Sequence, residues 1–260
     1  MIEKFKVYLK RPNKDGITLS ERTIINHLVV IRSVFAHARK SNPDVDRYYP
    51  FGRGKIKIKF PESNKIGLTH EEVKRIEDLQ LKNEHENHCR NLWLFSFYFA
   101  GMRIGDVLSV KWSYFQDGRF YYAMNKNDKA DSLKVSPKVQ TILSQYEKFK
   151  NNKDDLIFPE LKKLDTLDNE FNVKKQISFA VSDIDKCLRT KIAEKAKIKK
   201  HLTMHIARHT FGNISGDKIP VQMLQKLYRH THISTTIGYQ QNFIHKDTDD
   251  ALDAVLNAGL

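Results

Sequence analysis

Residues 201–212 read HLTMHIARHTFG, and the second half of the chain is best interpreted outward from this stretch. Its apolar residues recur at helical spacing, which predicts a helix over 203–215. His205 and Arg208 lie three positions apart, so this helix places both on one face. An imidazole can exchange a proton near neutral pH, whereas a guanidinium is a permanent cation. The stretch therefore combines a proton-transfer group with an anion-binding group.

A second stretch, residues 227–239, reads LYRHTHISTTIGY. Tyr239 follows His230 by nine positions, with a Thr-Thr pair between them. A tyrosine hydroxyl has a reference pKa of about 10 and becomes a nucleophile only when a base accepts its proton. The chain has ten tyrosines. Only its spacing from His230 makes Tyr239 a candidate nucleophile.

A third stretch, residues 100–108, reads AGMRIGDVL and begins at the end of the longest apolar segment of the chain, residues 92–101. A cation at the end of a buried helix is difficult to explain as a solvated surface charge, which favours a functional role for Arg103. Asp106 follows three residues later. Phosphoryl transfer spreads negative charge over non-bridging oxygens, and two bidentate guanidiniums suit that charge. Arg103 and Arg208 are the candidates for this pair.

A small antiparallel sheet is predicted between these stretches. Three strand-like runs, 112–115, 119–126 and 132–136, are separated by an Asp-Gly turn and a polar loop. Lys126 lies at the end of the second run, in YYAMNKNDK, and Lys129 lies in the loop that follows.

The stretches AGMRIGDVL, YYAMNKNDK, HLTMHIARHTFG and LYRHTHISTTIGY together resemble the tyrosine recombinase (phage integrase) family, mobile-element integrase type, over nearly all of residues 63–260. The resemblance implies a fold that is mainly α with a small antiparallel β-sheet: a helical core-binding domain plus an α/β catalytic domain. It implies six catalytic positions and one supporting position. These are Arg103, Lys126, His205, Arg208, His230 and Tyr239, supported by Asp106.

The resemblance also implies how such a site works. Tyr239 attacks the scissile phosphate to give a 3′-phosphotyrosyl link, and Lys126 protonates the departing 5′ oxygen. The sequence departs from the family pattern at two points. Lys126 precedes Asn rather than the common Thr, so Lys129 stays open as the general acid, and Arg229 occupies a position where the family usually has glycine.

The charge of the chain indicates a polyanionic partner. Its 260 residues carry 45 Lys plus Arg against 31 Asp plus Glu, a net charge of +14, and residues 1–62 alone carry 14 basic and 6 acidic side chains. A membrane surface or an acidic protein would attract the same charge. A hydrophobic content of 40% excludes whole-chain disorder, and the longest apolar run is about half of what a bilayer crossing needs.

Four segments are predicted: a partial helical core-binding domain over 1–50, a basic interdomain linker over 51–65, a catalytic domain over 66–243 and a C-terminal tail helix over 244–260. The first domain contains a helix predicted over 21–40. An extended linker places alternating cations on one side. The candidate DNA-binding residues are Arg32, Arg39, Lys40, Arg53, Lys55, Lys57 and Lys59.

No cofactor and no metal are expected. The chain has no GxxxxGK[ST] loop for a nucleotide, no HExxH spacing and no paired carboxylates suited to a two-metal nuclease. Two groups could be considered as metal ligands, namely His85, His88 and Cys89, or His201, His205 and His209.

The sequence thus predicts a site-specific recombinase or integrase that breaks and rejoins double-stranded DNA at attachment sites, without metal or ATP, to integrate or excise a mobile element. We expect a homotetramer on DNA, a monomer when free and a bacterial cytoplasmic location at the nucleoid. A type IB topoisomerase and a non-catalytic DNA-binding regulator remain as alternatives. The first domain is short and begins abruptly, which leaves open whether a helix and an arm-binding domain are missing.

Overall fold

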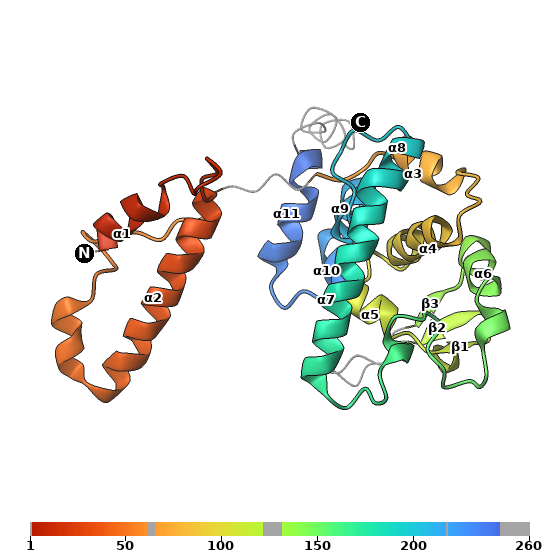
Figure 1. Cartoon of the computed structure of the whole chain (residues 1–260), viewed down its shortest axis with the longest axis horizontal. Helices are drawn as coiled ribbons and strands as arrows, with labels where there is room; N and C mark the ends of the chain where they lie inside the picture. Colours follow the sequence, from red (N-terminus) through yellow and green to blue (C-terminus); the bar gives the residue numbers. More distant parts are fainter. Residues whose placement is uncertain (1, 62–65, 122–131, 217, 245–260) are drawn as a thin grey trace, which may run out of the picture. The chain divides into compact units, whose positions relative to one another are not determined.

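The computed structural model describes residues 2–61, 66–121, 132–216 and 218–244. The chain divides into two compact units, Met1–Asn64 and Lys65–Leu260, which are described separately (Figure 1). Within the described ranges, neither unit contains a helix with both the length and the apolar character needed to cross a bilayer.

The first unit is a small helical module. It consists of α1 (Ile2–Leu9), α2 (Glu21–Ser41) and a 3₁₀ turn at Pro43–Tyr48. Helix α2 begins where the Ser20 side chain accepts a 3.2 Å hydrogen bond from the backbone N–H of Thr23, a standard N-cap. The sequence predicts this helix over 21–40, and α2 ends one residue later, at Ser41.

The stretch expected to start the linker packs within this first unit. Phe51 is buried and forms a small core with Ile25 and Leu28 of α2. Ile56 and Ile58 pack against the same core. Residues 51–58 therefore lie along the first unit rather than forming a free connection. Residues 52–55 form a turn with positive φ at Gly52 and Gly54, so the expected extended alternation of cations does not hold over Arg53 and Lys55.

The second unit is built around α4 (Glu84–Tyr98), whose residues Leu92, Trp93 and Phe95 are completely buried. Thr69 and Glu72 form the capping box that begins α3, as their spacing predicts. Among the described residues of this unit, the other α-helices are α3 (His70–Glu77), α5 (Ile104–Leu108), α6 (Pro137–Ser144), α7 (Glu170–Cys187), α8 (Ala193–Lys195), α9 (Met204–Ser215), α10 (Val221–Tyr228) and α11 (Ile233–Ile244).

The three-stranded antiparallel sheet has the order β1 (Phe115–Gln116), β2 (Arg119–Tyr121) and β3 (Ser132–Lys134). Asp117 and Gly118 join the first two strands with φ of 48° and 69°, the left-handed values of a tight hairpin turn. Trp112–Tyr114, expected to be extended, forms a 3₁₀ turn instead. The predicted class, mainly α with a small antiparallel sheet, is confirmed.

Helix α9 packs against α4, and α10 and α11 pack against each other and near α9 (Figure 1). Helix α11 is described as far as Ile244. The tail helix predicted over 244–260 therefore lies, beyond that residue, outside the described part of the chain.

Candidate active site

The chain turns sharply between α4 and α5, and this turn positions Arg103. Ala100 and Gly101 both have positive φ, 55° and 68°. A Cβ on Gly101 would lie 2.5 Å from the Cα of Arg208, so only glycine lets the turn approach α9 this closely. Arg103 follows as the residue preceding α5. The turn brings two arginines 105 positions apart into one site.

Arg208 is held rigidly by the surrounding backbone. Its side chain is buried, with the residue only 4% exposed. The guanidinium donates to the carbonyl of Gly101 at 3.0 Å and to the carbonyl of Tyr228 at 2.6 Å. It also lies over the ring of Tyr228, 3.9 Å from the ring centroid, in cation–π geometry. Arg208 thus connects α9, the Gly101 turn and the end of α10.

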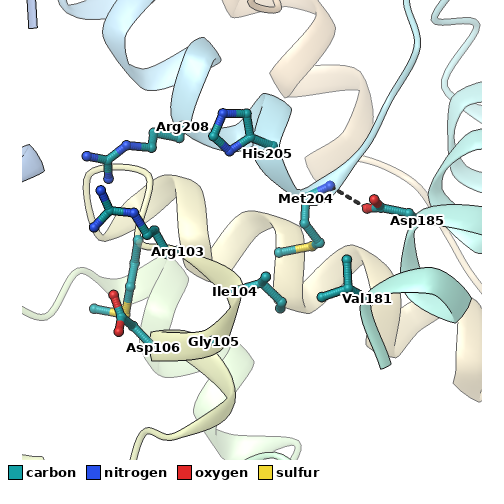
Figure 2. A pocket seen from close by; sticks show the side chains of 10 residues that line it. Arg103, Ile104, Gly105, Asp106, Val181, Asp185, Met204, His205 and Arg208 are labelled. Carbon is teal, nitrogen blue, oxygen red and sulfur yellow. Dashed lines mark hydrogen bonds between the residues drawn. The ribbon is translucent and has the colours of Figure 1, made fainter. Parts of the chain in front are cut away.

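Arg103 and Arg208 lie side by side at one end of a pocket of about 370 Å³ (Figure 2). Arg103 is exposed, and Asp106 lines the same pocket from α5. Burial, followed by the nearby charge of Arg103, lowers the pKa of Arg208. Two cations held together in this way repel one another, and an anion bound between them offsets this repulsion. The pocket is therefore suited to an anion with several oxygens.

His230 completes this end of the site. Its Nε2 lies 3.1 Å from a guanidinium nitrogen of Arg208, and its Nδ1 lies 3.0 Å from Oγ1 of Thr236. Because a guanidinium only donates, Nε2 must accept, so the proton of a neutral His230 lies on Nδ1 and is donated to Thr236. Arg229, directly before His230, is the C-cap residue of α10 and has a φ of 56°, in the left-handed region. This backbone conformation directs the His230 ring toward Arg208. The family usually has glycine where this chain has Arg229.

Tyr239 lies on α11 next to this arrangement and is half-buried. Its ring centroid is 5.5 Å from that of His230 and 4.9 Å from that of Tyr228. The guanidinium of Arg208 lies 5.9 Å from its ring centroid. Gly212 permits this proximity, since a Cβ there would lie 3.0 Å from the Cβ of Tyr239. The structure therefore brings Arg103, Arg208, His230 and Tyr239 together.

His205 also lines the pocket, from the first turn of α9 (Figure 2). It is exposed, and its ring contacts that of His209 edge-on at 4.5 Å between centroids. The predicted helix thus does place His205 and Arg208 toward the same pocket. Lys126 and its alternative Lys129 lie outside the described residues.

Asp185 is a pocket residue that sequence reasoning missed. Its Oδ1 accepts a 2.7 Å hydrogen bond from the backbone N–H of Met204, the first residue of α9 (Figure 2). Thr203, the N-cap residue of this helix, makes no side-chain cap bond. Burial raises the pKa of Asp185, whereas the hydrogen bond and nearby basic groups, His205 among them, oppose this shift. No local sequence signal predicts a cap supplied from α7.

The candidate DNA-binding residues of the first unit are all exposed, but two have partners within the unit. Arg39 forms an ion pair with Asp46 and lies 4.6 Å over the ring of Tyr49. Lys55 donates to the backbone carbonyl of Tyr49 at 2.6 Å. The others are Arg32, Lys40, Arg53, Lys57 and Lys59.

The fold and the site together define the class of this protein as a tyrosine recombinase. A model of the phage integrase family matches residues 67–245, and the chain belongs to that family. The membership confirms the resemblance inferred from the sequence. A comparison with curated protein sequences finds no match.

Solved structures of recombinases share the fold at low identity. The Tn1549 transposon integrase, in complex with transposon right end DNA, aligns with a TM-score of 0.63 and 14% identity over 99% of this chain and 84% of its own. XerH site-specific recombinase, bound to palindromic difH substrate, aligns with a TM-score of 0.60 and 16% identity, over 92% and 68%. A lambda integrase dimer bound to a COC′ core site aligns at 0.52 and 13% identity, over 92% and 69%.

Proposed function

We propose that this chain is a site-specific DNA recombinase that cleaves and rejoins strands through a 3′-phosphotyrosyl intermediate to integrate or excise a mobile element. The observation that carries the proposal is the arrangement around Arg208: Arg103 lines the same pocket as Arg208, and His230 and Tyr239 adjoin the Arg208 guanidinium from two further segments of the chain. Two cations, an imidazole and a phenol are the groups that phosphoryl transfer to tyrosine requires.

In the proposed cleavage step, the Tyr239 oxygen bonds to the scissile phosphorus while the bond from phosphorus to the 5′ oxygen breaks. His205 accepts the phenol proton, and Lys126 supplies a proton to the leaving 5′ oxygen. Rejoining reverses these transfers, with the 5′-hydroxyl of a partner strand displacing the tyrosine. The phosphotyrosyl link retains the energy of the broken bond, so the proposed reaction needs no ATP. Arg103 and Arg208 supply the positive charge, so no catalytic metal is proposed.

Arg103, Arg208 and His230 would hold the non-bridging oxygens, supported by Asp106. In the free protein, Nε2 of His230 accepts from Arg208 and cannot also donate to a phosphate. Binding of the phosphate would draw the guanidinium toward its oxygens and leave Nε2 able to take up a proton. We expect His230 to become a donor only when DNA occupies the site.

Double-stranded DNA is the proposed partner, with recombination sites as the specific target. The Tn1549 integrase, XerH and lambda integrase structures each contain DNA, and the last is a dimer on its site. We propose that this chain forms a homotetramer on DNA, is a monomer when free and works at the bacterial nucleoid. The basic first unit, including the exposed cations of residues 53–59, would contact the phosphate backbone.

A nicked suicide substrate tests the proposal. Incubation with candidate attachment-site DNA should give a protein–DNA adduct that survives denaturant, and peptide mapping should locate it at Tyr239. Tyr239→Phe should bind the DNA with similar affinity and give no adduct. Adduct formation at another tyrosine, or none with any attachment-site DNA, would overturn it. Relaxation of supercoiled plasmid by the monomer, without strand exchange between sites, would instead support a topoisomerase.

A further inference from the structure

Two cysteines, a histidine and an aspartate lie together between α4 and α7. His85 and Cys89 are one turn apart on α4, and Asp183 and Cys187 are one turn apart on α7. The ligand atoms of His85, Cys89 and Cys187 all lie within 4.8 Å of one another. None of these residues lines the pocket that holds Arg103 and Arg208.

Two separations inside this cluster match the edges of a tetrahedral metal site. With zinc–sulfur bonds of about 2.3 Å and zinc–nitrogen bonds of about 2.0 Å, neighbouring ligand atoms lie about 3.3–3.8 Å apart. The Sγ of Cys89 is 3.7 Å from Nε2 of His85, and this Nε2 is 3.4 Å from Oδ2 of Asp183. The single nitrogen Nε2 of His85 thus faces both a sulfur and a carboxylate oxygen.

The set of donors indicates which cation suits the cluster. Two sulfurs and an imidazole favour zinc over magnesium or calcium, which prefer oxygen ligands. Both cysteines are buried, whereas the side chains of His85 and Asp183 are 51% and 66% exposed and leave a path from solvent. Pairs spaced i and i+4 present both ligands on the same helical face.

His88, one of the ligands considered from the sequence, is committed elsewhere. Its Nδ1 lies 2.8 Å from the hydroxyl of Tyr146, and its Nε2 lies 2.6 Å from Oε1 of Glu160. The partner that the sequence did not suggest is Cys187, which is 98 positions from Cys89.

We propose that His85, Cys89 and Cys187, with Asp183 as the fourth ligand, form a structural zinc site that clamps α4 to α7. Binding would displace any remaining thiol protons to solvent as the thiolates form. Helix α4 leads into the turn that positions Arg103, and α7 carries Asp185, which caps α9. A clamp between these helices would therefore stabilise the scaffold of the active site without taking part in its chemistry.

Cobalt(II) and zinc(II) titrations test this proposal. The full chain, stripped of metal with EDTA and kept reduced, should bind one Co²⁺ and develop a thiolate-to-cobalt charge-transfer band, which one equivalent of Zn²⁺ removes. Zinc at about one hundred times its Kd should raise the Tm by roughly 5–10 °C. Cys187→Ser removes one of the two thiolates, so it should weaken Co²⁺ binding by roughly 100-fold or more and lower the intensity of the charge-transfer band.

Controls separate the cluster from incidental histidine binding. His85→Ala removes an exposed ligand, so it should fold normally and still lose the zinc-dependent rise in Tm. His70→Ala, an exposed histidine on α3, should retain it. The proposal is overturned if the reduced protein gives no charge-transfer band, if His85→Ala keeps the full rise in Tm, or if the cysteines form a disulfide and the reduced protein binds no metal.

This proposal stands apart from the proposed function. EDTA could slow DNA cleavage by removing zinc from the clamp. In that case His85→Ala should cleave equally slowly without EDTA, and adding EDTA should not slow this variant further. An equal additional effect of EDTA on His85→Ala would instead indicate a metal in the chemistry and contradict metal-independent cleavage, while leaving the cobalt spectrum unchanged.

Discussion

Arg208 and Tyr228 bind each other through two reciprocal hydrogen bonds. The guanidinium of Arg208 donates to the carbonyl of Tyr228 at 2.6 Å, and the hydroxyl of Tyr228 donates to the carbonyl of Arg208. Tyr228 is completely buried, and this burial raises the pKa of its hydroxyl. The phenol of Tyr228 is thus a structural donor, although it lies beside the candidate nucleophile Tyr239.

Tyr228→Phe separates these two tyrosines. The variant leaves the buried carbonyl of Arg208 without its donor, so the free energy of unfolding should fall by about 1–3 kcal/mol. It should still form the covalent DNA adduct, more slowly. Tyr239→Phe should show the reverse, with nearly unchanged stability and no adduct. Urea denaturation and the suicide-substrate assay measure both quantities, and loss of the adduct in Tyr228→Phe at full stability would reverse the assignment.

Asp185→Asn should change how stability depends on pH. The raised pKa of Asp185 means that the folded state holds this proton more tightly than the unfolded state. Its contribution is fully present below the unfolded pKa, near 3.9, and is lost as pH rises through the folded pKa. Asparagine can keep the cap to Met204 without the charge. Relative to the wild type, the variant should therefore gain stability in urea denaturation as the pH rises above the unfolded pKa of about 3.9.

Arg229→Gly should stabilise the second unit. A non-glycine residue in the left-handed region costs roughly 1–2 kcal/mol, and glycine relieves this at the expense of a more flexible unfolded chain. We expect a net gain of up to about 1 kcal/mol in the free energy of unfolding. Arg229→Ala is the matched control, because it removes the side chain and keeps the strain. Equal stability of the two variants would show that the backbone conformation costs nothing here.

The salt dependence of DNA binding tests the exposed lysines of the first unit. Each phosphate contact adds about −0.9 to the log–log slope, so replacing Lys57 and Lys59 by Gln should flatten it by up to roughly 1.8. Lys55, which donates to the Tyr49 carbonyl, should contribute less when replaced. Fluorescence anisotropy against salt concentration measures the slope. The exposed Lys153 serves as a control, and an unchanged slope in the double variant would place both lysines in solvent.

A 5′-thio substrate tests the general acid. If Lys126 protonates the departing 5′ oxygen, Lys126→Ala should cleave ordinary DNA very slowly and recover when a bridging sulfur leaves as a thiolate, which needs no proton. Arg208→Ala loses charge stabilisation on the non-bridging oxygens and should stay impaired on both substrates. Recovery by Lys129→Ala instead would assign the general acid to Lys129. Recovery by neither variant would show that neither lysine is the general acid.

The sequence by itself determined the features that depend on local interactions. The Thr69–Glu72 capping box, the Asp-Gly turn and the helix carrying His205 and Arg208 all involve residues within a few positions of one another. The spacing of His230 and Tyr239 was equally readable. Such features need only backbone geometry and a short stretch of chain, so their patterns survive in any tertiary setting.

The tertiary structure alone decided which distant groups meet. Asp185 caps a helix that begins 19 residues later, and Cys187 lies beside Cys89 across 98 positions. Likewise, only packing distinguishes buried Tyr228 from half-buried Tyr239. Arg39 and the start of the expected linker also gain partners only when the first unit folds. These contacts depend on how helices pack, and no short stretch of sequence encodes the partner that packing supplies.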